Sequence, residues 1–247
     1  SNAGFVVTRD GVVVFDALAS PPLAEKLISL IRRVTQKPIK RVIVSHYHAD
    51  HFYGLQVFKA LGAEIWAHRA AEGATGTEEA AQRLAQRREA LFPWVDENTQ
   101  LLEADYFVEG DTDFEMGGVK FALRHVGPAH SSEDLALMVR NDGLLFAGDL
   151  VFIGRVPFVG DADSAGWIAG MDKLIALKPK VLVPGHGGPS RNPGKDLVFT
   201  RDYLKFLRTH MGQAARDMVP FEQAYENTDW SKYRFMPAFN EANRINA

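Results

Sequence analysis

Three imidazoles and one carboxylate lie within six residues of this 247-residue sequence, at His46, His48, Asp50 and His51. They follow an apolar run at residues 41–45, which predicts a short buried strand. Residues two apart on an extended chain project to the same side, so His46 and His48 can bind one ion together. The turn that follows then directs Asp50 and His51 toward a second position. We favour a metal site over a surface histidine cluster or a helix cap by Asp50, because such clusters ordinarily bind metal.

Three further candidate ligands each follow a predicted strand and sit beside glycine or proline. They are His130 after residues 119–126, Asp149 after residues 144–147 and His186 after residues 181–183. Taken singly, each is more typical of a turn than of a ligand. Because groups at the same ends of neighbouring strands converge, the repeated placement predicts that these side chains join the first cluster.

The elements that must position these residues are strand runs, each half of the chain ending in helix. Residues 4–7 and 12–15 predict a hairpin. Further strands are expected at residues 41–45, 64–67, 107–108, 119–126, 135–140, 143–147 and 181–183, with helices at residues 23–34, 52–61, 78–91, 167–176, 197–209 and 211–218. The predicted helix at residues 78–91 is rich in charged residues, and we interpret it as part of a surface insertion at about residues 75–95. This order predicts two β sheets with helices outside them, in a single domain of residues 1–247.

Composition excludes several classes of protein. The formal net charge is −3, from 28 Lys and Arg against 31 Asp and Glu, so no basic field favours nucleic acid as a partner. No apolar run is long enough to span a membrane. The absence of cysteine excludes disulfides and thiolate ligands, so any metal must be held by histidine and carboxylate. We therefore expect a soluble protein with a small-molecule substrate, while its oligomeric state stays open.

The first residues bear on localisation. Ser1-Asn2-Ala3 is typical of what tag removal leaves, and Gly4 already begins a predicted strand. This pattern is consistent with a natural chain that begins earlier, with a signal peptide or a first strand removed. Both the cytoplasm and the periplasm remain possible compartments.

The His-x-His-x-Asp-His motif, the Gly148-Asp149 pair and the Pro184-Gly185-His186-Gly187 segment resemble the metallo-β-lactamase superfamily, from about residue 4 to about residue 190. The resemblance implies an α+β fold, an αββα sandwich of two mixed β sheets with helices on the outer faces. It implies one metal bound by His46, His48 and His130, a second bound by Asp50, His51 and His186, and Asp149 as the bridge. Nitrogen and oxygen ligands suit two Zn²⁺ ions per chain, and iron or manganese are alternatives. The opening residues and the loop before His130 are similar to hydrolases associated with sulfur oxidation or quinoprotein systems.

The expected reaction is hydrolysis of an ester, thioester, lactone or lactam by a hydroxide that bridges the two metals, with Asp50 as a catalytic residue that takes or relays a proton. Two alternatives stay open. One is a mononuclear iron dioxygenase acting on a sulfur substrate, although retention of Asp50, His51 and His186 favours two metals. The other is a non-catalytic metal-binding accessory protein.

Supporting residues are less defined by the sequence. Asp16 is either a hydrogen-bond acceptor for a ligand imidazole or an ordinary turn carboxylate. His68 reads as a structural histidine, and His125 and His210 belong to no motif. Candidates for the substrate pocket are Phe52, Tyr53, Phe92, Trp94, Phe152, Phe158 and Arg155, of which Arg155 could meet a carboxylate.

Overall fold

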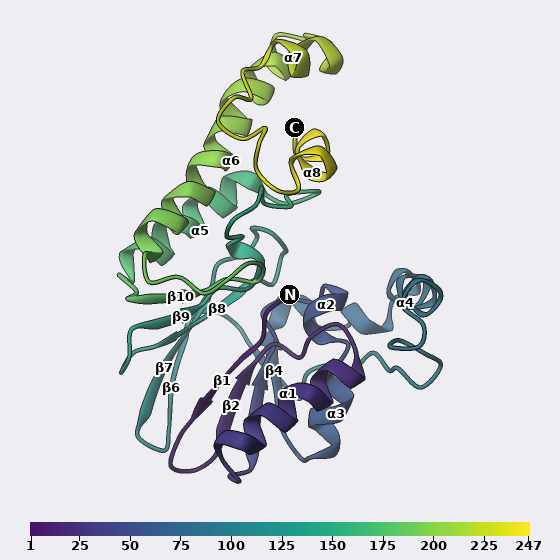
Figure 1. Ribbon diagram of the computed structural model, residues 1–247, viewed down its shortest axis with the longest axis vertical. Coiled ribbons are helices and arrows are strands. Elements are labelled where there is room, and N and C mark those ends of the chain that lie inside the picture. The colour runs from purple at the N-terminus through teal and green to yellow at the C-terminus, as the bar shows by residue number, and fades with distance from the viewer.

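Two five-stranded sheets form the centre of the computed structural model, which describes residues 1–247 (Figure 1). The first sheet has the order β1 (Gly4–Val7), β2 (Val12–Phe15), β3 (Ile39–Ile43), β4 (Glu64–His68) and β5 (Tyr106–Val108). The second has the order β10 (Val181–Val183), β9 (Leu144–Phe146), β8 (Leu135–Val139), β7 (Val119–His125) and β6 (Thr112–Met116). Both sheets are mixed, because each contains parallel and antiparallel pairs.

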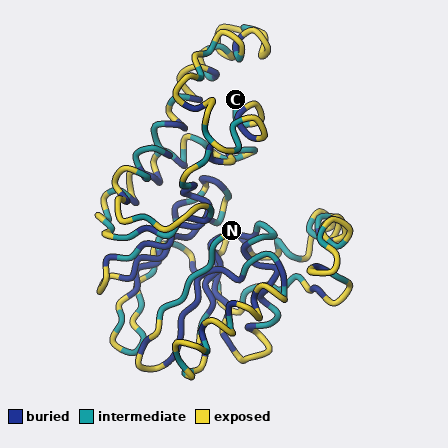
Figure 2. The backbone as a smooth tube through the Cα atoms, in the orientation of Figure 1, coloured by how far each residue is buried: buried dark blue, intermediate teal, exposed yellow.

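The two sheets pack face to face over a core of buried apolar side chains. That core contains Phe15 and Ile43 from the first sheet and Phe121, Leu137 and Phe146 from the second. Every residue of β8 is buried, so its sequence is a continuous apolar run rather than an alternating one. Figure 2 shows the buried residues concentrated in the strands.

Helices α1 (Pro21–Val34) and α3 (Leu55–Ala60) pack on the outer face of the first sheet, and α5 (Ser164–Ala176) and α6 (Pro193–Arg216) on that of the second (Figure 1). Helices α2 (Ala49–Phe52) and α4 (Glu78–Ala90) follow the first sheet's third and fourth strands, and α7 (Phe221–Asn227) and α8 (Phe239–Asn246) lie beside the far part of α6. Short 3-10 turns lie at Arg69–Ala71, Ala74–Gly76 and Gly148–Leu150. None of these helices is both long and apolar enough to cross a membrane.

Local sequence explains where several helices begin. Pro21 and Pro22 occupy the first turn of α1, where the missing N–H groups cost no helical hydrogen bond. Thr77 caps α4 by accepting from the Ala80 N–H at 3.1 Å, and Glu78 and Glu79 follow in its first turn. Asp163 caps α5 by accepting from the N–H groups of Ala165 and Gly166.

Helix α4 stands out from the body of the molecule beside α2 (Figure 1). Leu84 is its only buried residue and joins the core cluster beneath α1 and α3. Arg88 of the same helix donates to the Asp96 and Thr99 carbonyls, at 2.7 and 2.9 Å. The predicted surface insertion is therefore a charged helix attached through one buried apolar side chain and one arginine.

The structure differs from the predicted elements in four places. The helix expected at residues 52–61 is interrupted at Gly54, whose N–H donates to the Leu18 carbonyl at 3.3 Å rather than to a carbonyl of the preceding turn. The two closing helices expected at residues 197–209 and 211–218 are one continuous helix, α6, which Gly212 does not break. Strand β6 was not expected, since Asp113 and Glu115 lower its strand propensity. Helices α7 and α8 were likewise not expected.

Candidate metal centre

All seven predicted ligands lie at one edge of the two sheets. The register of β2 against β3 places Phe15 beside Ile43, so that the residues after both strands are neighbours. The register of β9 against β10 places Phe146 beside Val183 and brings the two following loops together. The Leu135 N–H donates to the Ser45 carbonyl at 2.9 Å and ties the two sheets at this edge.

The first group consists of His46, His48, His130 and Asp149, whose ligand atoms lie within 4.8 Å of one another. The Nδ1 atom of His48 is 3.0 Å from the Nε2 atoms of both His46 and His130. The Oδ2 atom of Asp149 is 3.5 Å from His130 Nε2 and 4.0 Å from His46 Nε2. Three ring nitrogens and one carboxylate oxygen therefore converge on one position.

The second group consists of Asp50, His51 and His186. The Oδ2 atom of Asp50 is 3.4 Å from His51 Nε2 and 3.1 Å from His186 Nε2. The backbone turns into α2 between His48 and Asp50, which separates this group from the first.

Asp149 lies between the two groups. Its Oδ1 is 3.1 Å from His51 Nε2, and its Oδ2 is 3.4 Å from His186 Nε2 as well as near His130. Gly185 permits this approach, because a Cβ at that position would collide with Asp149 Oδ1. A single carboxylate thus faces ring nitrogens of both groups.

Asp16 and Ser45 contact the Nδ1 atoms of His51 and His46, on the side of each ring away from the cluster. Asp16 Oδ2 accepts from His51 Nδ1 at 2.8 Å, and its Oδ1 accepts from the Ser45 N–H at 2.7 Å. Ser45 Oγ donates to Asp16 Oδ2 at 2.9 Å and lies 2.9 Å from His46 Nδ1. With Nδ1 of both rings facing these partners, Nε2 of His46 and His51 is directed at the cluster and is the nitrogen that a neutral ring would offer to a metal. Asp16 is therefore a partner of a candidate ligand, the first of its two sequence interpretations.

Burial and charge set the protonation of the two groups differently in the metal-free protein. Burial lowers the pKa of His46, His48 and His130, to about 4 in His130. Burial acts in the same direction on His51 and His186. Asp149 faces both of those rings, and together with Asp16 at His51 and Asp50 at His186 it raises their pKa above the usual value.

The residues fit a bound cation. His51 Nε2 and Asp149 Oδ1 are buried and have no regular hydrogen-bond partner. Unprotonated imidazole nitrogens and carboxylate oxygens are the ligands that zinc and similar divalent ions accept. A cation among them would satisfy atoms that the protein itself leaves unpaired.

Comparison with known proteins defines the family. The Metallo-beta-lactamase superfamily profile matches residues 1–186. The chain belongs to the metallo-beta-lactamase superfamily. Its predicted family and fold are confirmed, and it carries a histidine and aspartate cluster able to bind metal.

Individual relatives of this superfamily member are distant. It is 23% identical to a linear primary-alkylsulfatase of Pseudomonas sp. (strain ATCC 19151), in an alignment that covers 80% of this chain and 44% of that protein. It is 24% identical to a type 2 metallo-beta-lactamase of Elizabethkingia meningoseptica, covering 75% of this chain and 68% of that protein. The chain therefore spans less than half of the alkylsulfatase and about two thirds of the lactamase.

Solved structures show the same fold. The stereoselective inverting sec-alkylsulfatase Pisa1 from Pseudomonas sp. superposes with a TM-score of 0.75 at 18% identity, covering 92% of this chain and 42% of that one. A metallo-beta-lactamase from Pontibacter korlensis superposes with a TM-score of 0.63 at 23% identity, covering 81% and 85%.

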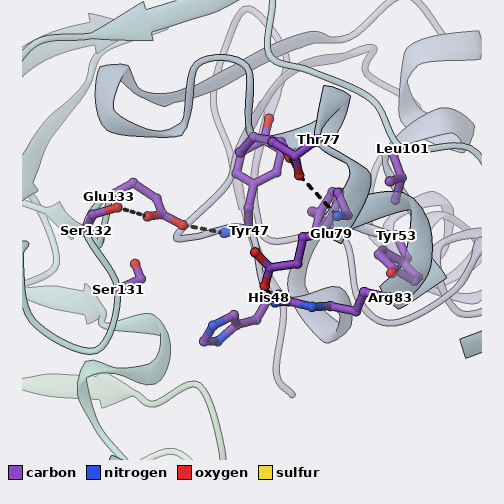
Figure 3. Close-up of a pocket in the computed structure, with 13 residues that line it drawn as sticks. Tyr47, His48, Tyr53, Thr77, Glu79, Arg83, Leu101, Ser131, Ser132 and Glu133 are labelled. Atoms are coloured by element: carbon purple, nitrogen blue, oxygen red, sulfur yellow. Dashed lines mark hydrogen bonds and ion pairs between the residues drawn. The ribbon is translucent and has the colours of Figure 1, made fainter. Parts of the chain in front are cut away.

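A cleft of about 390 Å³ lies over the cluster of this superfamily member. Asp50 and His186 are its most accessible candidate ligands, with 37% and 26% of their side chains exposed, whereas His46 and His51 are fully buried. Phe152, Phe158 and Arg155 also line the cleft, as the sequence suggested for the substrate pocket. Phe52 and Tyr53 line an adjoining pocket of similar volume, which Figure 3 shows.

Other sequence candidates lie away from the cluster. Phe92 and Trp94 are exposed and line neither cavity. His68 is buried and stacks on His125, with ring centroids 3.5 Å apart, and His210 contacts the Phe206 carbonyl on α6. These three histidines therefore do not join the metal centre.

Sequence reasoning missed two residues of the cleft, Arg83 and Arg87 of α4. Their spacing of four residues, which puts both on one helix face, was visible in the sequence. Nothing in the sequence showed that this face turns toward the cluster.

Proposed function

We propose that the protein is a dinuclear zinc hydrolase of esters, thioesters, lactones or lactams. His46, His48 and His130 would hold one ion, Asp50, His51 and His186 the other, and Asp149 both. The supporting observation is the position of Asp149, whose oxygens lie 3.1 to 3.5 Å from ring nitrogens of both groups. The substrate is a small molecule, and the names of the distant relatives leave its identity open.

Divalent ions held there would supply Lewis acidity, which lowers the pKa of water to roughly 7 and polarises the substrate oxygen. In the reaction, water adds to the acyl carbon, the bond to the leaving oxygen, sulfur or nitrogen breaks, and one proton passes to the leaving group. The reaction adds the elements of water across the cleaved bond and needs neither an oxidant nor a reductant.

Asp50 is the residue that we assign to proton transfer. Its carboxylate is partly exposed at the cleft, whereas the carboxylate of Asp149 is nearly buried. Burial by itself would raise the pKa of Asp50, but hydrogen bonds from His186 and His51 outweigh it and hold the pKa below its usual range. Asp50 is therefore ionised at neutral pH, and its place at the cleft lets it relay a proton from the attacking water to the leaving group.

Two alternative functions fit the structure less well. A mononuclear iron dioxygenase would need only the first group, yet Asp50, His51 and His186 also converge within 4.8 Å. A non-catalytic accessory protein would not need substrate access, yet the cluster lies beneath a cleft of about 390 Å³. The second group and the cleft together favour two metals and catalysis.

The test is the metal content of protein purified without added metal, followed by assays of that protein and its chelated form on nitrocefin, a thioester and a lactone. We expect about two zinc ions per chain and chelator-sensitive hydrolysis of one of these substrates. One iron per chain with oxygen uptake and no hydrolysis would favour the dioxygenase. A chain that binds no metal after reconstitution would contradict the seven-residue site.

A further inference from the structure

Three arginines line the cleft over the metal centre. Arg83 and Arg87 come from α4, and Arg155 comes from the loop that follows Gly148–Leu150. They share the cleft with Asp50 and His186, the candidate ligands most accessible from it. A molecule that reaches the metal centre through this cleft therefore passes guanidinium groups.

Two of these charges have no carboxylate partner in the protein. Arg83 pairs with Glu79 at 2.6 Å, one turn earlier on the same helix. Neither Arg87 nor Arg155 forms an ion pair. Arg155 Nε donates only to the Val156 carbonyl, at 3.3 Å, and its guanidinium lies 5.7 Å from the centre of the Phe152 ring. Its remaining donors are free for a ligand.

The charge of the cleft favours an anion. Asp50 and Asp149 are the only carboxylates that line it, and both face histidines of the metal centre. Two divalent ions would exceed the charge of those two carboxylates. The uncompensated guanidinium groups then add positive charge at the entrance, and a low-dielectric cleft concentrates their field.

Helix α4 carries its two arginines on the side that faces the cleft. Leu84 anchors the helix to the core, and the spacing of Arg83 and Arg87 keeps them one above the other. Figure 3 shows Arg83 extending from α4 toward His48, with Glu79 beside it. Arg83 and His48 line both the cleft and the adjoining pocket, so the two cavities adjoin at these side chains.

We propose that Arg87 and Arg155, with Arg83 beside them, bind an anionic group of the substrate while its scissile bond lies at the metal centre. This inference rests on the proposed hydrolase function and names its substrate class, an organic anion. Planar guanidinium groups bind carboxylate and sulfate oxygens through paired hydrogen bonds, which lysine cannot reproduce. The adjoining pocket also contains polar groups, Glu79 and Glu133 among them, and its apolar side chains Phe52, Tyr53 and Leu101 would contact the apolar part of the same molecule.

The first test measures binding to the zinc-reconstituted protein by calorimetry. The probes are the mono-4-nitroanilide of glutaric acid, which carries a carboxylate, and the 4-nitroanilide of butyric acid, which is its neutral counterpart. We expect Arg87→Gln and Arg155→Gln each to weaken binding of the charged probe roughly tenfold and to change binding of the neutral probe less than about twofold. Raising the salt concentration from about 50 mM to about 300 mM should weaken binding of the charged probe and leave binding of the neutral probe unchanged.

Arg33→Gln is the matched control. Arg33 is an exposed residue of α1 that lines neither cavity, so this variant loses the same charge without changing the cleft. Equal affinity for the two probes, no measurable binding of the charged probe, or affinities that neither cleft substitution changes would overturn the proposal. Arg87 is exposed and forms no ion pair, so its replacement is not expected to unfold the chain.

The second test locates the anion by turnover of mono-4-nitrophenyl glutarate, 4-nitrophenyl butyrate and 4-nitrophenyl sulfate. Preference for the glutarate ester, with a higher KM and an unchanged kcat in Arg87→Gln, assigns the anion to a tail remote from the scissile bond. Preference for the sulfate assigns it to the group that is cleaved. If no compound is hydrolysed but the charged probe still binds selectively, the proposed hydrolase function fails and the anion site stands.

Discussion

At the scale of single residues, the centre depends on which ring nitrogen each histidine presents. Ser45 and Asp16 occupy Nδ1 of His46 and His51, which leaves Nε2 of both rings free. His48 is the exception, since its Nδ1 faces the cluster. Asp16 also adopts a left-handed backbone with φ 64°, a conformation that aspartate tolerates better than most residues. Its position is therefore set by the backbone as well as by its hydrogen bonds.

Replacing Asp16 with asparagine tests this orienting role. Asparagine keeps the size and tolerates the left-handed backbone, but it cannot accept all three hydrogen bonds of the carboxylate. We expect zinc affinity of the second group to fall about 10- to 100-fold, with a smaller change at the first group. Competition with a chromogenic chelator measures both affinities.

The matched control for Asp16→Asn is Asp105→Asn. Asp105 also accepts a backbone N–H of the first sheet, from Ile65 at 2.9 Å, but its other partner is Lys59 rather than an imidazole. This variant should leave both zinc affinities unchanged. Equal zinc affinities in Asp16→Asn and the natural chain would show that Asp16 is an ordinary turn residue.

The pKa directions of the ligand histidines predict a pH dependence of zinc binding. At His51 and His186 the pKa in the metal-free protein lies above 6.5, so zinc must displace protons there near neutral pH. At His46, His48 and His130 the pKa lies below 6.5, and above that pH these rings are already neutral. Affinity for the second zinc should therefore rise with pH by up to about tenfold per unit for each proton displaced, while affinity for the first changes little.

Chelator competition at about pH 6 and about pH 8 measures this difference. His186→Ala removes one of the two rings with a raised pKa and should reduce the pH dependence of the second site. Parallel pH dependence of the two affinities would mean that the two groups are protonated alike, against the prediction.

At the scale of secondary-structure elements, the stacked rings of His68 and His125 join β4 of the first sheet to β7 of the second. The ring planes are 9° apart, and His68 Nδ1 accepts from the Ala70 N–H at 3.2 Å. Burial first, and then the charge of His125, lower the pKa of His68. Folding therefore favours the neutral form of the His68 side chain over the charged form.

This preference predicts an acid-sensitive contact. Because the unfolded chain binds more protons at His68 than the folded chain does, this residue's contribution is fully present above the unfolded pKa near 6.5 and is lost as pH falls below it. In metal-free protein, the natural chain should lose more unfolding free energy than His68→Asn between about pH 7.5 and about pH 5.5. Urea unfolding at both pH values measures the difference. His210→Asn, on α6, is the control and should follow the natural chain.

Periodicity predicted most elements, and packing between distant segments explains those it missed. The break between α2 and α3 depends on the Leu18 carbonyl, which lies more than thirty residues earlier and accepts from the Gly54 N–H at 3.3 Å. Strand β6 is an edge strand that pairs only with β7, and its exposed acidic residues hide the alternation of Thr112, Phe114 and Met116. Such elements owe their conformation to a partner that local sequence does not reveal.

At the scale of the whole molecule, the metal centre joins the two sheets. Strand β3 of the first sheet leads into His46, His48, Asp50 and His51, and the loops of the second sheet supply His130, Asp149 and His186. The dense motif and the ends of the predicted strands were enough to predict which seven residues converge. The arrangement of α4 over the cleft was not predictable, because Leu84 is the only buried residue of that helix and its charged faces are alike in sequence.

Because its ligands come from both sheets, bound metal should stabilise the whole fold rather than one loop. A ligand present at about 100 times its dissociation constant adds roughly 2.7 kcal/mol to the unfolding free energy, which is about 5–10 °C in Tm for a chain of this size. Removing zinc with a chelator and dialysing the chelator away should lower Tm by about this amount, and zinc should restore it. His130→Ala removes a ligand that the second sheet supplies, so zinc should raise the Tm of this variant less. His210→Ala should show the same zinc-dependent change in Tm as the natural chain. A Tm that does not respond to zinc in the natural chain would mean that the cluster does not cross-link the sheets through metal.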